Sequence, residues 1–377
     1  MRRKIKRDTE IKEFERDLNS DEDWLEISTQ RKRRYVKGRI LHRIHDGISI
    51  FDDIKYPGPT FDVNKMVDSI IDTIDNYDVA GYSYAIVRYG KLLDAAGVGY
   101  ARTRSEQNSE PMSPYTRMVS ASLAKPVCAI SIMKLIEEGK IQLDDKAYNF
   151  IKDKYPNVHD TVKNITIYQL LTHTSGLNGP AKLSGFDAVL KNAVMPTQNS
   201  DYHNANYWFL AFVVEGVTGQ GYIDYARRNI LIPMTISEMN NKVDTKPCLY
   251  YKQGELFDGV SWGDFNTTAI GAYGWYASAI DWAKFLAYFR YNKVLDKNIR
   301  YLMLNDDKRF FGFQKWFGED RGTYYGHGGD FYKNGYKGFR GGIMSFPDEI
   351  DAVLLINTYG NFDPETILIN AYHAAYS

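Results

Sequence analysis

Residues 118–125 read Met-Val-Ser-Ala-Ser-Leu-Ala-Lys, and they join a strand-like run to an apolar pattern that predicts a helix up to Glu138. The stretch contains a Ser-x-x-Lys motif, Ser122-Leu-Ala-Lys125, at the start of that helix. Residues three apart share a helix face, so we expect the Lys125 amine beside the Ser122 hydroxyl. The N-terminus of a helix also favours developing negative charge. The motif therefore predicts a nucleophilic serine with a lysine that can accept its proton.

Two other serines lie in motifs of similar form. Ser131-Ile-Met-Lys134 repeats the pattern, but Ser131 falls well inside the helix, where we expect its hydroxyl to bond the helix backbone. Gly259-Val-Ser-Trp-Gly263 matches the G-x-S-x-G of a strand–turn–helix nucleophile elbow. No buried strand is predicted before it and no helix after it, so we interpret it as a loop. Ser122 is thus the preferred nucleophile.

The order of the predicted elements indicates an α/β (α+β) fold. A helix capped by Asp62 and a last helix near Pro364 flank four strand-like runs, at 82–88, 92–100, 338–346 and 352–357. The chain between these runs is mostly helical in pattern. We therefore expect a sheet domain built from residues 61–120 and 300–377, a mainly helical domain over 121–299, and an active site at their interface.

Residues 1–60 read as a basic extension of this body. Residues 1–45 carry 14 Lys and Arg against 9 Asp and Glu, although the whole chain has 47 of each. A helix is predicted over 8–26 and a hairpin over 39–51, with a turn at Asp46-Gly47. The basic start resembles the n-region of a signal peptide, but no apolar h-region follows, so we expect a cytoplasmic protein.

The composition excludes several classes of function. A net charge of zero argues against a dedicated nucleic-acid binder. Two cysteines, Cys128 and Cys248, are too few for a disulfide scaffold or a Cys-only metal site, and neither a metal nor a cofactor is expected. No apolar run is long enough for a transmembrane helix. The expected partner is a small-molecule or peptide acyl substrate, and the oligomeric state stays open.

Further motifs follow Ser122 in a fixed order. They are Met133–Asp145 (MKLIEEGKIQLDD), Ile165–Leu177 (ITIYQLLTHTSGL), Tyr202-His-Asn204, Tyr273–Asp281 (YGWYASAID) and His327-Gly-Gly329 followed by Gly338-Phe-Arg. From about Asp62 to Asn357 the sequence resembles the serine β-lactamase-like family, which groups class C β-lactamases, D-Ala-D-Ala carboxypeptidases and esterases. The resemblance implies a β-lactamase/transpeptidase-like fold, with an antiparallel sheet flanked by helices and an inserted all-helical domain.

The resemblance also implies roles for the catalytic residues. Ser122 would attack an acyl carbonyl, and Lys125 and Tyr202 would activate it, one of them as the general base. Tyr202 would then pass the proton to the leaving group. Asn204 would bond the substrate or Lys125. The pattern leaves open which of Lys125 and Tyr202 is the base.

The third motif is expected to line the site. The resemblance implies an oxyanion hole from the backbone N–H groups of Ser122 and Asp330, with His327 and Gly329 beside it. His173 is interpreted as a structural loop residue that bonds backbone. Trp208 and Trp275 are also placed in the core rather than at the pocket edge.

The chain departs from class C β-lactamases at this motif, because they carry Lys-Thr-Gly where it has His327-Gly-Gly. A histidine of ordinary pKa is mostly neutral at pH 7 and binds a carboxylate less well than lysine. We therefore expect an esterase, D-amino-acid peptidase or carboxypeptidase rather than a true β-lactamase, with residues 330–337 at the rim of the pocket. Two alternatives stay open: an acyltransferase with the same Ser-Lys-Tyr machinery, and a catalytically silent scaffold.

Overall fold

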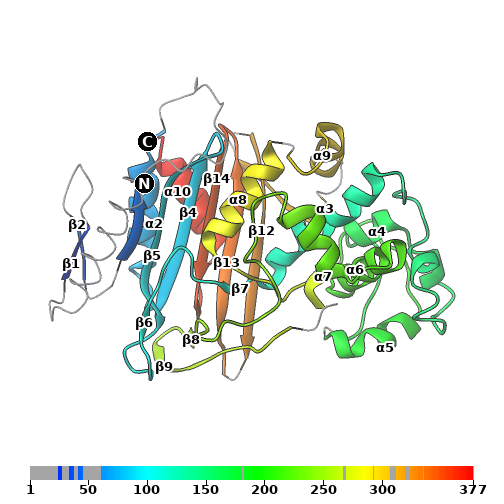
Figure 1. Cartoon of the computed structure of the whole chain (residues 1–377), viewed down its shortest axis with the longest axis horizontal. Coiled ribbons are helices and arrows are strands. Elements are labelled where there is room, and N and C mark those ends of the chain that lie inside the picture. Colours follow the sequence, from blue (N-terminus) through cyan, green and yellow to red (C-terminus); the bar gives the residue numbers. More distant parts are fainter. Residues whose placement is uncertain are drawn as a thin grey trace.

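The computed structural model describes the backbone of residues 24–27, 34–37 and 41–45, and residues 61–180, 182–265, 269–291, 293–305, 311–318, 322–333 and 335–376. Its centre is an antiparallel sheet with the strand order β11-β12-β13-β14-β4-β5-β3 (Figure 1). The bounds along this order are Gln314–Gly318, Gly322–Lys333, Lys337–Phe346, Ile350–Ile356, Gly81–Arg88, Lys91–Arg102 and Leu41–His45. Strands from both ends of the chain therefore share one sheet.

Short strands extend and border this sheet. β6 (Glu110–Pro111) pairs with β5, and β8 (Tyr250–Lys252) pairs with β13, with β9 (Glu255–Val260) and, in parallel, with β15 (Thr358–Tyr359). Two small ladders stand apart from it. They are β7 (Met118–Val119) with β10 (Tyr276–Ala277), and β1 (Trp24–Ile27) with β2 (Arg34–Lys37).

Alternating side chains give the sheet two buried faces. On one face, residues such as Tyr84 and Leu354 pack with α2 (Val63–Ile74) and α10 (Pro364–Ala374). On the other, residues such as Ala85 and Leu355 share a core with α8 (Ala279–Arg290) and the helical part of the chain. Because strand side chains alternate between faces, one sheet serves two separate cores.

The remaining helices gather beyond the β12 edge of the sheet (Figure 1). They are α3 (Ala124–Glu137), α4 (Ile167–Leu171), α5 (Phe186–Lys191), α6 (Ala205–Thr218), α7 (Tyr222–Ala226) and α9 (Lys297–Leu304). The most apolar of them, α6, is buried from Ala205 to Val214 and contacts α3, α4 and α7. It is therefore the centre of this helical part.

The helix cap predicted at Asp62 is confirmed, and two turns contain glycines with a left-handed backbone. Asp62 caps α2 by accepting a hydrogen bond from the Asn64 backbone N–H at 3.0 Å. The turn between β4 and β5 has positive φ at both Tyr89 (52°) and Gly90 (69°), which fits a type I′ hairpin turn. Gly139 ends the α3 region with φ 69°.

Other expectations differ from the structure. Trp24–Glu26, the end of the helix expected over 8–26, belongs to strand β1, so that part of the prediction is wrong. β3 pairs with β5 of the main sheet, while residues 8–23 and the turn and second arm of the hairpin expected over 39–51 lie outside the described residues. Within the range assigned to the helical domain, β8 pairs with β13 and α8 packs on β4 and β14.

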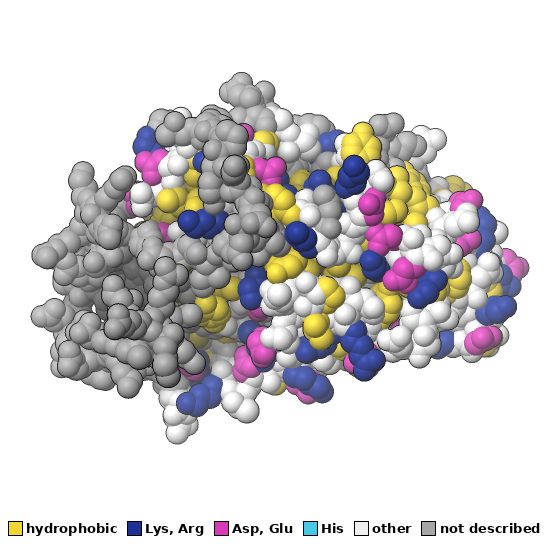
Figure 2. Space-filling view, turned by 45° about the horizontal axis from the view of Figure 1, so that its top comes forward, with side chains coloured by type: hydrophobic (Ala, Val, Ile, Leu, Met, Phe, Trp, Pro, Cys, Tyr) yellow, Lys and Arg dark blue, Asp and Glu magenta, His cyan; other side chains and the backbone are white. Residues whose placement is uncertain are grey.

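On the face that Figure 2 shows, Lys and Arg side chains are interspersed with Asp and Glu side chains, so neither sign of charge dominates it.

Among the described residues, no helix combines the length and the apolar character that a membrane span requires.

Candidate active site

Ser122 lies where β7 turns into α3, in a short 3-10 turn over Ala121–Leu123. Two hydrogen bonds fix the chain before it, from the Val119 N–H to the Tyr250 hydroxyl (2.7 Å) and from the Ser120 N–H to the Trp275 carbonyl (2.7 Å). Ala121 adopts a left-handed backbone with φ 46°, which is uncommon for a residue with a side chain. The nucleophile candidate therefore sits on a sharp, well-anchored turn.

Lys125 lies one helical turn further and is fully buried. Its Nζ lies 2.9 Å from Ser122 Oγ, 2.9 Å from Asn204 Oδ1 and 3.0 Å from the Ala272 carbonyl oxygen. Burial lowers the pKa of Lys125 from 10.5 to about 7. A neutral amine has two N–H donors for the Asn204 and Ala272 oxygens and one lone pair for the Ser122 hydroxyl. The surroundings of Lys125 thus suit a proton acceptor.

Tyr202 contacts the same serine from the loop before α6. Its hydroxyl donates a hydrogen bond to Ser122 Oγ at 2.8 Å. Although 46% of Tyr202 is exposed, the protein packed around it partly desolvates the phenol, and this desolvation raises the pKa of Tyr202 above its usual range. At neutral pH this phenol keeps its proton, so it is a donor to the serine oxygen rather than a phenolate base.

His173 holds the Tyr202 ring. The two rings stack with centroids 4.6 Å apart, and His173 itself has a left-handed backbone with φ 55°. Its Nδ1 accepts from the Asn206 side-chain amide (3.1 Å) and from the His203 backbone N–H (3.3 Å). The interpretation of His173 as a loop residue bonded to backbone is confirmed, and its contact with Tyr202 is an addition that the sequence did not indicate.

Strand β12 forms the facing wall. A Cβ on Gly329 would lie 3.0 Å from the Ser120 carbonyl oxygen and 3.2 Å from Ala121 Cβ, so the strand backbone approaches the serine turn closely. The Gly328 N–H points to this edge of the strand, where it donates to Gln314 Oε1 at 3.3 Å. Because strand N–H groups alternate in direction, the Asp330 N–H points to the same edge. It is therefore well placed to act as a donor beside Ser122.

His327 precedes these residues on β12 and is buried, with 3% of its surface exposed. Burial, and next the charge of Lys125, lower the pKa of His327 from 6.5 to about 3. Its Nδ1 lies 2.5 Å from the Gly328 carbonyl oxygen, and its ring centroid lies 6.3 Å from that of Tyr202. The histidine lining this site is therefore neutral at pH 7.

All seven residues singled out in the sequence lie in this region, but not all by their side chains. Ser122, Lys125, Tyr202 and Asn204 are joined by side-chain hydrogen bonds. The Asp330 side chain is exposed and accepts a long hydrogen bond from the Tyr359 hydroxyl (3.5 Å), so its backbone is the part that faces the serine turn. Trp208 and Trp275 are fully buried, as expected.

The rejected serines lie elsewhere. The Ser131 hydroxyl donates to the Val127 carbonyl at 2.8 Å, which confirms that it bonds its own helix. Gly259 and Val260 end β9, a partly exposed strand, and Ser261–Gly263 continue as a loop. Among the described residues, no group of three or more His, Cys, Asp or Glu side chains is placed to hold a metal ion.

Three contributors to the site carry no sequence signal of their own. The Ala272 carbonyl acts through its backbone, so its residue type gives no information. Gln314 reaches Gly328 from the neighbouring strand β11. On the opposite face of β12, the Glu365 carboxylate lies where a Cβ on Gly328 would be, so this side chain packs directly on the glycine. The adjacent glycines Gly328 and Gly329 of the third motif are the one feature of the sequence that points to close packing at this strand.

With this geometry in place, comparison with known proteins identifies the class. The profile of the Beta-lactamase family matches residues 67–374, so the chain belongs to this family. Protein flp of Staphylococcus aureus (strain N315) is 29% identical over 229 residues, which are 55% of this chain and 45% of that protein. The putative penicillin-binding protein PbpX of Bacillus subtilis (strain 168) is 30% identical over 213 residues, 53% of this chain and 52% of PbpX. The matches thus span about half the length of these curated relatives.

Solved structures show the same fold. The octameric penicillin-binding protein homologue from Pyrococcus abyssi is 22% identical with a TM-score of 0.67, and the match covers 82% of this chain and 76% of that one. The D-alanine carboxypeptidase AmpC from Burkholderia cenocepacia is 15% identical, also with a TM-score of 0.67, over 83% of this chain and 97% of that one. The β-lactamase/transpeptidase-like fold is therefore established.

Proposed function

We propose that the protein is a serine hydrolase that forms an acyl-enzyme at Ser122 with an ester or amide substrate. The observation that carries this proposal is that one hydroxyl oxygen, Ser122 Oγ, is contacted by both the Lys125 amine (2.9 Å) and the Tyr202 hydroxyl (2.8 Å). The first group suits proton removal and the second suits proton delivery. Intact contacts of this kind argue against a silent scaffold.

Acylation follows from these contacts. Neutral Lys125 takes the proton of Ser122 as Oγ bonds to the substrate carbonyl carbon. The carbonyl oxygen becomes negative and is stabilised by the backbone N–H groups of Ser122 and Asp330. The bond to the leaving group then breaks as Tyr202 donates its proton to that group, and Lys125 returns a proton to Tyr202. The products are the acyl-enzyme and the neutral alcohol or amine.

Deacylation reverses the sequence with water. Water attacks the acyl carbonyl as its proton passes through the Tyr202 hydroxyl to neutral Lys125, and Lys125 then gives a proton to Ser122 Oγ as the acyl bond breaks. Asn204 fixes the position of Lys125 throughout, because its Oδ1 accepts one amine N–H. No step requires a metal or a cofactor.

The substrate class is narrowed by His327. A neutral imidazole offers no charge for a penicillin carboxylate, so esters and D-amino-acid amides or peptides are favoured over β-lactams. Two structural neighbours support this substrate class: a D-stereospecific amidohydrolase from Streptomyces, with 19% identity and a TM-score of 0.64, and the D-alanine carboxypeptidase.

The test compares two serines that both sit in Ser-x-x-Lys motifs. Ser122→Ala is expected to abolish hydrolysis of p-nitrophenyl acetate, whereas Ser131→Ala, which loses one intrahelical hydrogen bond, keeps the parent rate. If Ser122→Ala hydrolyses the ester at the parent rate, the nucleophile assignment fails.

A further inference from the structure

The two N–H groups proposed for the oxyanion hole lie on separate elements. The Ser122 N–H belongs to the turn between β7 and α3, and the Asp330 N–H belongs to β12. Donors stabilise a developing negative charge best when they are fixed in advance, and a small displacement of one donor weakens the effect. The spacing of these donors therefore depends on what holds the turn and what holds the strand.

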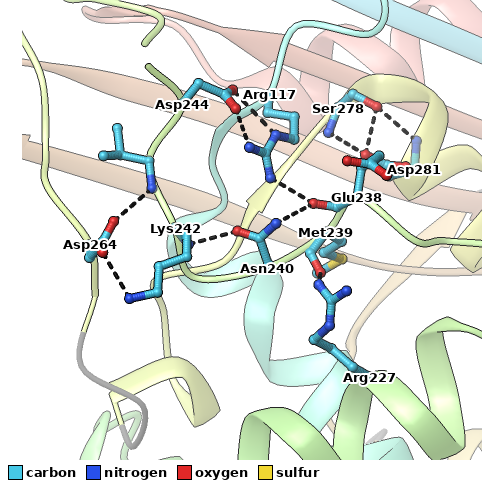
Figure 3. Close-up of polar contacts among 11 residues, drawn as sticks. Arg117, Arg227, Glu238, Met239, Asn240, Lys242, Asp244, Asp264, Ser278 and Asp281 are labelled. Atoms are coloured by element: carbon cyan, nitrogen blue, oxygen red, sulfur yellow. Dashed lines mark hydrogen bonds and ion pairs between the residues drawn. The ribbon is translucent and has the colours of Figure 1, made fainter. Parts of the chain in front are cut away.

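The serine side is held by a network of polar contacts. Figure 3 shows Arg117, which directly precedes β7, between the Asp244 carboxylate and the Glu238 carbonyl, to which it donates at 2.6 Å. In the same network, the Lys242 amine donates to Asp264 at 2.8 Å. The strand before the nucleophile is thus tied to the neighbouring segment 238–244.

The strand side is backed by Glu365, near the start of α10. Gly328 of β12 and Gly342 of β13 are directly opposite each other in the sheet. A Cβ on Gly328 would fall on the Glu365 carboxylate, and a Cβ on Gly342 would lie 3.3 Å from Glu365 Cγ. The glycines therefore leave room that Glu365 fills. Because adjacent strand residues face opposite sides, Glu365 packs behind the segment whose front, at Gly329, lies against the serine turn.

Glu365 and Asp363 form a hydrogen-bonded pair that we call the carboxyl pair. Asp363, the N-cap of α10, accepts from the Thr366 N–H at 3.2 Å and from the protonated Glu365 carboxyl group. Burial, and next the hydrogen bond and charge of Asp363, raise the pKa of Glu365 from 4.5 to about 8. Burial also acts to raise the pKa of Asp363, but its hydrogen bonds with Glu365 and Thr366 outweigh this and lower it. At neutral pH the carboxyl pair therefore holds one proton.

Charged side chains of β12, β13 and α10 also face the carboxyl pair. The charge of Arg340, on β13, acts to lower the pKa of Glu365, but less than burial raises it. Asp330 lies directly opposite Arg340 on β12, and its carboxylate opposes a further negative charge. His373 lies two turns further along α10, at roughly 12 Å. Ionisation of Glu365 therefore adds a second negative charge close to an existing one.

We infer that Glu365 is a positioning residue for catalysis: its neutral form keeps residues 328–330 of β12 against the serine turn, and its ionisation releases them. The inference rests on the proposed function, which assigns the Asp330 N–H to the oxyanion hole. An ionised carboxylate is poorly accommodated between strand backbone and Asp363, so it turns towards water. The strand then loses its support, and the donor moves away from the developing charge.

The kinetic test is the alkaline half of the pH profile. Hydrolysis of p-nitrophenyl acetate by the parent, corrected for the rate without protein, is expected to have a kcat/KM about tenfold lower at pH 9.5 than at pH 8. Lys125 and Tyr202 do not cause such a decline. Lys125 becomes active as it loses its proton, and desolvation raises the pKa of Tyr202 above its usual range.

Substitutions at Glu365 separate its charge from its volume. Glu365→Gln stays neutral and still donates to Asp363, so it is expected to remove the decline between pH 8 and 9.5. Glu365→Ala leaves the space behind Gly328 empty and is expected to lower kcat at pH 7 about tenfold, most of which glutamine restores. The matched control is Glu255→Gln on β9, which removes an exposed carboxylate paired with Lys252 and is expected to keep the decline.

A structural measurement keeps this inference separable from the proposed function. In protein labelled with 13C-glycine, the Cα signals of Gly328 and Gly329, assigned through Gly→Ala variants, are expected to shift with a midpoint near pH 8, and Glu365→Gln is expected to abolish the shift. Signals that do not move, or a kinetic decline that is absent in the parent or persists in Glu365→Gln, overturn the inference. Shifts of this kind without any ester hydrolysis reject the proposed function and support the coupling of Glu365 to β12.

Discussion

The Lys125 amine lies 2.9 Å from the Ser122 hydroxyl oxygen while fully enclosed by protein. Burial lowers the pKa of Lys125 to about 7, so the amine loses its proton near neutral pH. Only the neutral amine accepts the serine proton. We therefore expect kcat/KM for ester hydrolysis to rise as the pH passes through about 7.

This profile is checked by steady-state kinetics from pH 5 to 9, with Lys125→Arg as the matched variant. Arginine stays protonated throughout and is expected to lower kcat/KM by about 10²-fold or more at every pH. A parent profile that is flat across this range would contradict the assignment of Lys125 as base.

The stacking of His173 on Tyr202 makes a separate prediction. His173→Asn tolerates the left-handed backbone but removes the ring, so Tyr202 loses a support without losing its own hydrogen bond. We expect kcat to fall about tenfold with KM little changed, because proton delivery suffers more than substrate binding. His173→Phe, which keeps a ring, should recover part of kcat. An unchanged kcat in His173→Asn would show that the ring contact is not used.

Because His327 is neutral, we expect a free carboxylate on the substrate to have little effect on kcat/KM. Two N-acyl-D-Ala-D-Ala substrates, one with a free carboxylate and one with a C-terminal amide, are expected to differ in kcat/KM by less than about threefold at pH 7. Since burial lowers the pKa of His327 to about 3, the ratio should stay constant down to pH 5.5. A preference for the carboxylate that grows as pH falls through 6.5 would show a protonated His327.

The ion pair beneath α8 gives a prediction about stability. Arg290 donates to the carboxylate of Asp351 at 2.7 Å, and Asp351 is fully buried in β14. Asp351→Asn leaves Arg290 without its charge partner, so the free energy of unfolding in urea should fall by about 3 to 5 kcal/mol. Asp187→Asn, which breaks the exposed pair with Lys191, serves as control and should change stability little. If both substitutions lower the free energy of unfolding by the same amount, burial of the Arg290–Asp351 pair does not explain its contribution to stability.

Much of the fold could be predicted because local patterns agreed with tertiary contacts. The helix predicted after Asp62 is α2, which buries Met66, Ile70 and Ile74, and the strand-like runs at 82–88 and 92–100 correspond to β4 and β5. Strand β12 was the main omission. Its glycines interrupt a sequence that otherwise contains strand formers such as Tyr324 and Phe331, and a Cβ on Gly326 would lie 2.1 Å from the Ile343 carbonyl oxygen, so close packing requires glycine there.

The residues of the candidate site also divide into those that the sequence could predict and those that it could not. Ser122 and Lys125 share one helical turn, so their meeting follows from spacing, whereas Tyr202 and His327 were placed by resemblance to a family. The Ala272 carbonyl and the His173 ring contact arise from tertiary packing, which leaves no local pattern. The low pKa of His327 depends on burial that no sequence window reports.

The central claim is that Ser122 carries the acyl group. The most direct measurement is covalent labelling with a fluorophosphonate probe, followed by intact mass and peptide mapping. One adduct per chain is predicted, in the peptide that contains residues 118–125 and on Ser122, and none in Ser122→Ala. Labelling of a different serine, or ester hydrolysis by a protein that the probe leaves unmodified, would contradict the account.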